Sequence, residues 1–288
     1  LELGWHQLLA CDNHLWKLNS KAQNELIAIL DGKCKAAVTG SWTFNERAYS
    51  LSSLSLISAF GVGIDGIDIN LTKENQIRVT NTPGVLNDDV ADIALTLILT
   101  TTRNIINADK YARSRLWEKN PMPYGSGLAG KTLGIVGFGR IGEAVAQRVL
   151  PLKLKIVYHN RKKKNSPHKY FASLIDLAHN SDILLCILPG GQDTERVITA
   201  EVLKALGPTG IFINIGRGTT VDENSLIEFL AHEKIAAAGL DVYAEEPSIP
   251  EALRELDNTV LLPHIGSATI ETRDAMGDLV PVSYTHLT

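Results

Sequence analysis

Residues 131–142, KTLGIVGFGRIG, form an apolar strand-like run that leads directly into three glycines and then into a helical stretch beginning EAVAQRV. Gly137 permits a tight turn, Gly139 lets the backbone approach a phosphate, and Gly142 lets the helix pack close to the strand. N–H groups at a helix N-terminus attract an anion. Three glycines alone are a weak signal, because a tight strand-to-helix connection has the same pattern. Here a second strand, 155–160, completes a βαβ unit, which favours a dinucleotide-binding site.

Four more apolar runs follow residue 160, and helical patterns such as 199–207 and 222–234 separate them. This alternation is typical of an α/β fold with a doubly wound parallel sheet, in which ligands bind beyond the carboxyl ends of the strands. The six predicted strands are 131–137, 155–160, 182–189, 210–216, 236–243 and 259–266.

The first third of the chain also alternates between helical and strand-like patterns, which indicates a second α/β layer with a parallel sheet. Residues 88–107 carry two aspartates in the first turn and then an apolar stretch, so they predict one long helix. Residues 117–130 are rich in proline and glycine and predict a loop. The expected helices in the first third are 22–30, 44–53 and 69–76, and the expected strands are 35–40, 55–60 and 77–82.

With 288 residues, the chain is longer than one typical domain. We predict a lobe formed by residues 1–87 and 268–288, and an inserted dinucleotide-binding domain over residues 88–267. Residues 1–12 look like the end of a first helix, so we expect the preceding strand of a sheet ordered 2-1-3-4-5 to be missing and the lobe to be open in its middle. Pro281 predicts the end of the last helix, and the tail after it resembles foreign sequence. The lobe is therefore expected to be truncated at both ends.

Composition excludes several classes of protein. A net charge of −4 gives no reason to expect nucleic acid as a partner, and the longest apolar stretch, 93–99, is too short to span a bilayer. Cys11, Cys34 and Cys186 are too few and too scattered for a disulfide framework or a zinc site, so no metal is expected. Such cysteine usage fits a reducing compartment, and we expect a cytoplasmic protein.

Three polar residues follow predicted strands of the dinucleotide-binding domain. Arg217 comes after 210–216, Glu246 lies in DVYAEEP, and His264 ends LLPH. Any one of them has a simple explanation, since strands end in polar loops. Together they supply a cation for an anionic substrate, a carboxylate and an imidazole, which is a set suited to acid/base chemistry on a small acid.

The segments INIGRG (213–218), GLDVYAEEP (239–247) and LPHIGSAT (262–269), together with the fingerprint GFGRIG, resemble the D-isomer-specific 2-hydroxyacid dehydrogenase family. The upstream segments 58–68 and 79–92 resemble most closely the NADP-type glyoxylate/hydroxypyruvate reductases. The resemblance implies a Rossmann-type domain inserted into a flavodoxin-like substrate lobe, an active site between the two, and a homodimer. It also implies reduction of a small 2-oxo acid, glyoxylate or hydroxypyruvate, by hydride from a nicotinamide cofactor.

By this resemblance His264 is the acid/base that gives a proton to the substrate carbonyl oxygen. A neighbouring carboxylate favours the protonated imidazole. Glu245 competes with Glu246 for that place, but the family spacing of five residues after the aspartate selects Glu246. Arg217 would bind the substrate carboxylate in two-pronged geometry, and the backbone N–H groups of Val62 and Gly63 would complete that site.

The resemblance also supplies the expected cofactor contacts. Asp241 would accept from the nicotinamide carboxamide, or it has only a capping or loop-stabilising role. NAD-specific members place an acid at position 160, whereas this chain has Asn160 followed by Arg161, which favours NADPH over NADH. The expected cofactor-binding residues are Gly137, Gly139, Arg140, Ile141, Gly142, Asn160, Arg161, Leu188, Thr194, Ile215, Asp241, His264 and Gly266.

Other members of the family remain as alternatives. A phosphoglycerate-type NAD dehydrogenase should carry an acid at position 160, and a formate dehydrogenase should carry glutamine at position 246. A cofactor-sensing corepressor that keeps the three catalytic residues is an alternative from a different functional class. An inactive fragment is a further alternative, because of the expected truncation.

Overall fold

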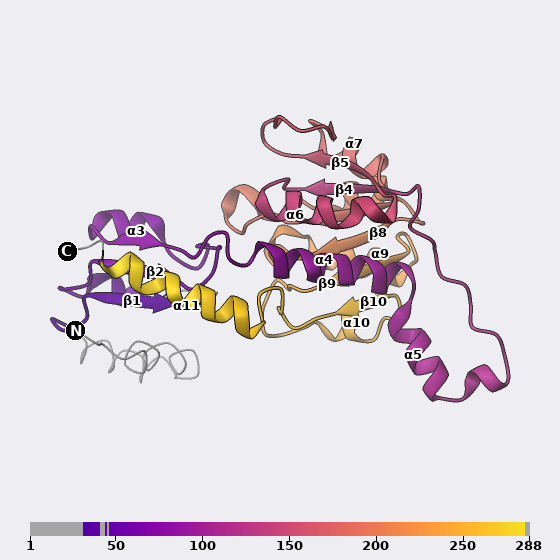
Figure 1. Cartoon of the computed structure of the whole chain (residues 1–288), viewed down its shortest axis with the longest axis horizontal. Helices are drawn as coiled ribbons and strands as arrows, with labels where there is room; N and C mark the ends of the chain where they lie inside the picture. Colours follow the sequence, from indigo (N-terminus) through magenta and orange to yellow (C-terminus); the bar gives the residue numbers. More distant parts are fainter. Residues whose placement is uncertain (1–30, 41–43, 45, 286–288) are drawn as a thin grey trace. The chain divides into compact units, whose positions relative to one another are not determined.

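The computed structural model describes residues 31–40, 44 and 46–285. These residues form two compact units (Figure 1). The larger unit is Asn87–Ala268, and the smaller unit joins the described residues up to Leu86 with those from Thr269 onward. The predictions of a helix over 22–30 and of a helix end and missing strand at 1–12 lie outside the described residues.

The larger unit is built on a sheet of seven parallel strands in the order β10-β9-β8-β7-β4-β5-β6. Val136 of β4 pairs with His159 of β5 and Cys186 of β7, so the carboxyl ends of the central strands are level. The α/β class with parallel strands is as predicted. The strands are β4 Thr132–Val136, β5 Lys155–His159, β6 Lys169–Tyr170, β7 Ile183–Cys186, β8 Ile211–Asn214, β9 Ala237–Leu240 and β10 Thr259–Leu261.

The prediction of six strands in this sheet was wrong by one, because β6 is a seventh. It has only two residues, Lys169 and Tyr170, and pairs with β5 at the edge of the sheet. One of its two side chains is a lysine, so β6 has no apolar run of the kind that marks a strand in the sequence.

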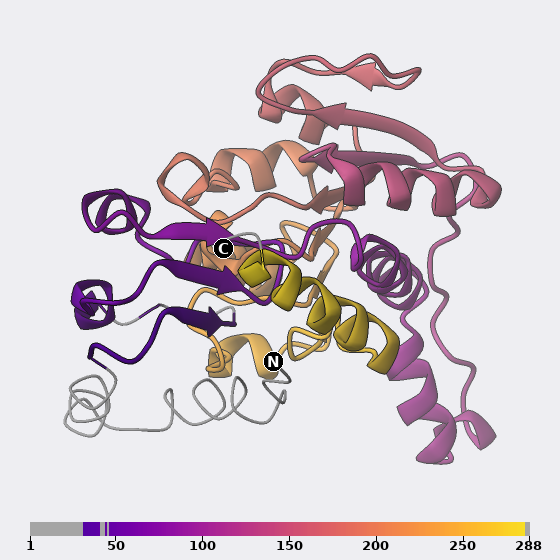
Figure 2. The ribbon, with the colours of Figure 1, turned by 60° about the vertical axis from the view of Figure 1, so that its left-hand side comes forward.

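Helices cover both faces of this sheet. Gly239 of β9 faces α4 (Asn87–Thr102), because a Cβ added there would lie 2.7 Å from Thr101 Oγ1. The helix α4 packs along α6 (Arg140–Val149) on that face (Figures 1 and 2). The other face is covered by α7 Leu174–His179, α8 Ala200–Leu206 and α9 Glu223–Ala231. A short helix, α10 (Glu251–Arg254), precedes β10.

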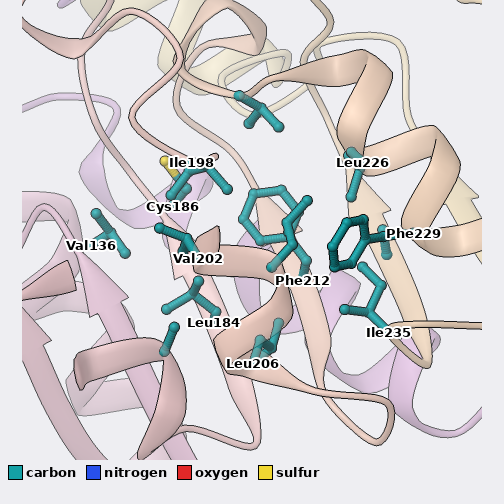
Figure 3. Packing of buried hydrophobic residues seen from close by; sticks show 14 of the residues in the cluster. Val136, Leu184, Cys186, Ile198, Val202, Leu206, Phe212, Leu226, Phe229 and Ile235 are labelled. Carbon is teal, nitrogen blue, oxygen red and sulfur yellow. The ribbon is translucent and has the colours of Figure 1, made fainter. Parts of the chain in front are cut away.

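Between the sheet and α7–α9 lies the largest described core cluster of this unit (Figure 3). Phe212 of β8 is fully buried among residues of α8 and α9, including Val202, Leu226 and Phe229. Complete burial of such side chains stabilises the fold by about 1.5–3 kcal/mol each. This core fixes the strands whose carboxyl ends carry the polar residues described below.

The predicted continuous helix over 88–107 is interrupted. α4 ends at Thr102, and a second helix, α5, spans Ile105–Arg113. Between them Asn104 adopts a left-handed conformation with φ of 52°, which asparagine tolerates better than most residues at a helix end. α5 and the short 3-10 helix η3 (Leu116–Glu118) project from the rest of the larger unit (Figure 1).

The smaller unit contains a parallel sheet of β1 (Ala36–Thr39), β2 (Leu56–Ala59) and β3 (Arg78–Thr80), paired in that order. Among the described residues these strands pair without a gap, so the predicted opening in the middle of the lobe is not found there. Residues 44–53 were predicted to be a helix, and within this range Glu46–Ser50 form a short 3-10 helix. The hydroxyl of Ser50 donates to the Arg47 carbonyl at 2.8 Å, a local bond that competes with helix propagation.

Among its described residues the smaller unit also has two α-helices. α3 (Ile69–Glu74) begins at Asp68, whose carboxylate accepts from the N–H groups of Asn70 and Leu71. α11 spans Ile270–Thr285 and lies against β2 (Figures 1 and 2). The prediction that Pro281 ends this helix was wrong, because the helix continues through it. A proline inside a helix removes one backbone hydrogen bond and crowds the preceding turn, but Met276 and Val280 are buried just before it, which favours the helix. No helix among the described residues is long and apolar enough to cross a membrane.

Candidate active site

The polar residues singled out in the sequence follow neighbouring strands of the larger sheet. Arg217 follows β8, Asp241 and Glu246 follow β9, and His264 follows β10. Because β8, β9 and β10 are adjacent and parallel, their carboxyl ends meet at one edge of the sheet. These four residues therefore converge, as their positions in the sequence predicted.

His264 and Glu246 form a direct, half-buried pair, in which His264 Nδ1 lies 2.6 Å from Glu246 Oε2. The other carboxylate oxygen of Glu246 accepts from the Tyr243 N–H at 3.0 Å. Burial acts to raise the pKa of Glu246, but the hydrogen bond and charge of His264 outweigh it, so the pKa is lowered. Glu246 is thus held as a carboxylate against the imidazole, and the neighbouring Glu245 is exposed.

Asp241 stabilises the turn that carries His264. Its two carboxylate oxygens accept from the N–H groups of Ile265 and Gly266, each at 2.8 Å. His264 has a left-handed φ of 55°, a conformation that costs a non-glycine residue about 1–2 kcal/mol. The two bonds to Asp241 help to offset that cost. Asp241 is almost fully buried, and burial raises its pKa. A loop-stabilising role for Asp241 is therefore observed.

Arg217 is half-buried, and its Nη1 donates to the Gly216 carbonyl at 2.9 Å. Its own carbonyl accepts from Asn214 Nδ2 at 3.0 Å and from Thr220 Oγ1 at 2.6 Å, which fixes the backbone from which the side chain extends. The positive charge of Arg217 also contributes to lowering the pKa of Glu246. The guanidinium therefore lies within electrostatic reach of the acid/base pair.

The turn after β4 is crowded at two of its glycines and open at the third. Gly137 has φ of +95°, and a Cβ there would come within 2.9 Å of the Ile187 carbonyl oxygen. A Cβ on Gly142 would lie 3.0 Å from the Gly137 carbonyl oxygen, so glycine lets α6 approach the turn. A Cβ on Gly139 would meet no atom within 4 Å, and no described side chain caps the first turn of α6. Open space in front of uncapped N–H groups suits an anion.

Asn160 is bonded to this turn. Its Oδ1 accepts from the Phe138 N–H at 2.7 Å, and its Nδ2 donates to the Phe138 carbonyl at 3.1 Å. The neutral amide pairs with both backbone polar groups of one residue, which a carboxylate cannot do because it only accepts. The next residue, Arg161, is exposed, and its Nη1 lies 3.7 Å from Asp193 Oδ2.

The remaining predicted cofactor contacts lie around this edge of the sheet. Leu188 follows β7, and its Cδ2 would be 3.2 Å from a Cβ on Gly137. Thr194 donates its hydroxyl to the Pro189 carbonyl at 2.7 Å. Ile215 is buried directly after β8. Arg140 and Ile141 begin α6.

The predicted substrate loop belongs to the smaller unit and follows β2. The Val62 carbonyl accepts from Asn81 Nδ2 at 2.9 Å, and the Gly61 carbonyl accepts from the Thr82 N–H at 2.9 Å. The segment after β3 thus holds the loop through its carbonyls. These bonds do not involve the N–H groups of Val62 and Gly63.

Two residues of the larger unit contact predicted site residues but were not themselves predicted from the sequence. Tyr243 donates its N–H to Glu246, and its hydroxyl donates to the Leu262 carbonyl at 2.9 Å, so it links the loops after β9 and β10. Its place within GLDVYAEEP was the available signal. Asp193 faces Arg161 from a different loop, and no local pattern marks that contact. The described residues contain no group of three or more side chains suited to hold a metal ion.

Two features of this sheet are typical of dinucleotide-binding dehydrogenases. The first is the glycine turn between β4 and α6, and the second is the histidine–carboxylate pair at the same edge of the sheet. The chain belongs to the D-isomer specific 2-hydroxyacid dehydrogenase family, because the NAD binding domain of that family matches residues 95–266. This is an oxidoreductase family that uses NAD or NADP. The predicted family, fold class and enzyme class are thereby confirmed.

Several similar proteins are named as reductases of 2-oxo acids. The chain is 46% identical to glyoxylate/hydroxypyruvate reductase A HPR2 of Arabidopsis thaliana over 85% of this chain and 79% of the relative. It is 44% identical to hydroxyphenylpyruvate reductase of Plectranthus scutellarioides over 90% and 84%. Among solved structures, the NADPH-dependent glyoxylate/hydroxypyruvate reductase of Sinorhizobium meliloti with NADP and malonate has a TM-score of 0.84 at 39% identity, covering 88% of this chain and 82% of that one.

Proposed function

We propose that this protein reduces a small 2-oxo acid, glyoxylate or hydroxypyruvate, to the corresponding 2-hydroxy acid with NADPH. The observation that carries the proposal is the His264–Glu246 pair, which lies within electrostatic reach of Arg217 at the carboxyl edge of the sheet. The names of similar proteins point to the same substrates. The phosphoglycerate-type alternative is less favoured, because position 160 holds a neutral asparagine.

His264 is proposed as the acid that gives its proton to the carbonyl oxygen of the substrate. Glu246 accepts from Nδ1, which leaves Nε2 to face the substrate, and its negative charge stabilises the imidazolium before transfer. When bound, the nicotinamide supplies the hydride. General acid catalysis of this kind accounts for about 10²- to 10⁴-fold in rate.

Arg217 is proposed to bind the substrate carboxylate and to polarise its keto oxygen. The guanidinium presents paired N–H donors that match a carboxylate, which the single ammonium group of lysine does not. We propose that the N–H groups of Val62 and Gly63 also donate to that carboxylate. On this proposal the smaller unit contributes to substrate binding and the larger unit binds the cofactor.

NADPH is proposed as the preferred cofactor. Asn160 carries no charge that would repel a 2′-phosphate, and the exposed guanidinium of Arg161 can donate to one. The turn from Gly137 to Gly142 would hold the pyrophosphate, with Arg140 and Ile141 at the N-terminus of α6. Asp241 would accept from the carboxamide at the other end of the cofactor, with Leu188, Thr194, Ile215 and Gly266 alongside.

A homodimer is proposed from the exposed apolar surface of the projecting segment. Ile105 and Ile106 on α5 are about half exposed, Trp117 is 72% exposed, and Tyr124 is fully exposed. Such a cluster is typical of a protein interface. Light scattering should give twice the mass of the chain, and Trp117→Asp should reduce it to a monomer. We also propose a reducing, cytoplasmic location, because three scattered cysteines do not suit a disulfide framework.

The test is a panel of 2-oxo acids mixed with purified protein and either NADPH or NADH. The panel contains glyoxylate, hydroxypyruvate, pyruvate and 4-hydroxyphenylpyruvate, the last because a similar protein is named for it. Oxidation of NADPH should be fastest with glyoxylate or hydroxypyruvate. If NADPH binds but no member of the panel is reduced, the corepressor alternative gains and the proposed activity is wrong.

A further inference from the structure

We propose that Asp193 is a second determinant of cofactor specificity, which weakens binding of a 2′-phosphate by competing for Arg161. The inference rests on the proposed preference for NADPH and adds an opposing residue to it. Asp193 lies in the short 3-10 helix Gln192–Thr194 after β7, far in sequence from Arg161 after β5. Its Oδ2 is 3.7 Å from Arg161 Nη1.

The two residues of this ion pair follow the strands on either side of β4, which leads into the glycine turn. The strands β7 and β5 flank β4 on its two sides, and β4 leads into the turn at Gly137. Neighbouring strands lie about 4.8 Å apart, so the loops that carry Asp193 and Arg161 begin roughly 10 Å apart. Their side chains therefore reach toward each other across the end of β4. A phosphate that binds Arg161 beside this turn must approach the Asp193 carboxylate.

The turn that carries Asp193 is well fixed. The Thr194 hydroxyl donates to the Pro189 carbonyl at 2.7 Å and to the Gly191 carbonyl at 3.1 Å. The Thr194 N–H also donates to the Gly191 carbonyl at 3.0 Å. These bonds hold the backbone next to Asp193, from which its carboxylate extends toward Arg161.

The ion pair itself is weak, because both side chains are nearly nine-tenths exposed, at 89% for Arg161 and 86% for Asp193. Such a pair adds little rigidity to Arg161. A phosphate monoester carries a charge of about −1.5 to −2 near neutral pH. Asp193 therefore acts mainly by repelling that charge and by occupying the guanidinium, rather than by positioning Arg161.

The test uses binding of adenosine 2′,5′-bisphosphate, with AMP as the probe that lacks the 2′-phosphate, measured by titration calorimetry on the full chain. In about 0.01 M salt, Asp193→Asn should tighten bisphosphate binding by about 2- to 5-fold and leave AMP binding unchanged. In about 1 M salt, where the screening length is about 3 Å, the gain should vanish. With NADPH and NADH as substrates, the variant should lower the KM for NADPH only.

Glu228→Gln is the matched control. It removes the same charge from an exposed ion pair with Lys234 (2.6 Å), at the end of α9, and should bind both probes like the wild type.

Arg161→Ala distinguishes the proposed phosphate site at Arg161 from the proposed role of Asp193. If Arg161→Ala weakens bisphosphate binding but Asp193→Asn does not tighten it, only the role of Asp193 is wrong. Weaker binding in Asp193→Asn would show a positioning role and overturn the inference. If Arg161→Ala leaves bisphosphate binding unchanged, the proposed phosphate site itself is wrong.

Discussion

The loops that follow β8–β10 and the loop that follows β5 lie at the same edge of the larger sheet, but they differ in how deeply their charged side chains are buried. At β8–β10, Glu246, Asp241 and His264 are half-buried or buried, and their bonds to each other and to backbone N–H groups are 2.6–3.0 Å long. Beyond β5, Arg161 and its partner Asp193 are almost fully exposed and 3.7 Å apart. The β8–β10 end fixes the position of a proton, and the β5 end presents charge to solvent.

This difference follows from the cost of burying charge. A buried carboxylate without partners is expensive, so each of those at β8–β10 needs several bonds and tolerates little change. An exposed ion pair is worth about 0–1 kcal/mol, so it can be altered without loss of stability. We therefore expect substitutions at the β8–β10 end to change turnover, and substitutions at the β5 end to change cofactor preference.

The largest effect is expected for His264→Ala. Loss of the proton donor should reduce turnover by about 10²- to 10⁴-fold, while the dissociation constant for NADPH stays close to that of the wild type. His179→Ala, which removes an exposed histidine at the end of α7, is the matched control and should be fully active. Turnover of His264→Ala near the wild-type rate would remove the proposed acid.

Arg217→Ala should lower turnover and also raise the KM for the 2-oxo acid, by about 10²-fold in the ratio kcat/KM. Arg217→Lys keeps the charge but loses the paired N–H donors, so it should recover only part of the loss. Steady-state kinetics at saturating NADPH measure both kcat and the KM for the 2-oxo acid. A fully active lysine variant would mean that charge alone suffices and that the two-pronged geometry is wrong.

Arg161→Ala should raise the KM for NADPH by about 10- to 100-fold through loss of charge-assisted hydrogen bonds, and leave the KM for NADH unchanged. Arg254→Ala removes an exposed arginine at the end of α10 and serves as the control. If NADH is already preferred by the wild type, the β5 end does not select NADPH as proposed.

The smallest effect is expected for Glu246→Gln. Glu246 Oε2 lies 2.6 Å from His264 Nδ1, and the hydrogen bond and charge of His264 lower the pKa of Glu246. The carboxylate is ionised above its lowered pKa, so it supports the imidazolium throughout the neutral range. Without that charge the pH above which reduction fades should fall. Glu245→Gln should leave the pH profile unchanged, and an unchanged profile in Glu246→Gln would exclude it as the partner.

Local patterns were enough to predict most of the larger unit. Five of the six predicted strands, β4, β5, β7, β8 and β9, each contain three or four consecutive buried residues, most of them apolar, as burial on both faces of the sheet requires. β6 escaped prediction because an edge strand of two residues carries no such run. The break after α4 escaped prediction because no glycine or proline marks it and the apolar Ile105 and Ile106 follow Asn104 directly.

The site was predictable to the extent that its residues follow strands. Arg217, Glu246 and His264 could be placed at one edge because parallel strands bring their carboxyl ends together. The bonds from Asn160 to Phe138 and the approach of Asp193 to Arg161 join loops that are 22 and 32 residues apart. Such contacts depend on the three-dimensional path of each loop, and no spacing rule in the sequence encodes them.

We propose that this chain delivers hydride to the carbonyl carbon of a 2-oxo acid while His264 protonates the oxygen. The direct measurement uses NADPH deuterated at both C4 positions, glyoxylate or hydroxypyruvate in ordinary water, and mass spectrometry of the product. We predict one deuterium on C2 of the 2-hydroxy acid in each molecule of product. A product without deuterium on carbon, or no product from either substrate, would contradict the account.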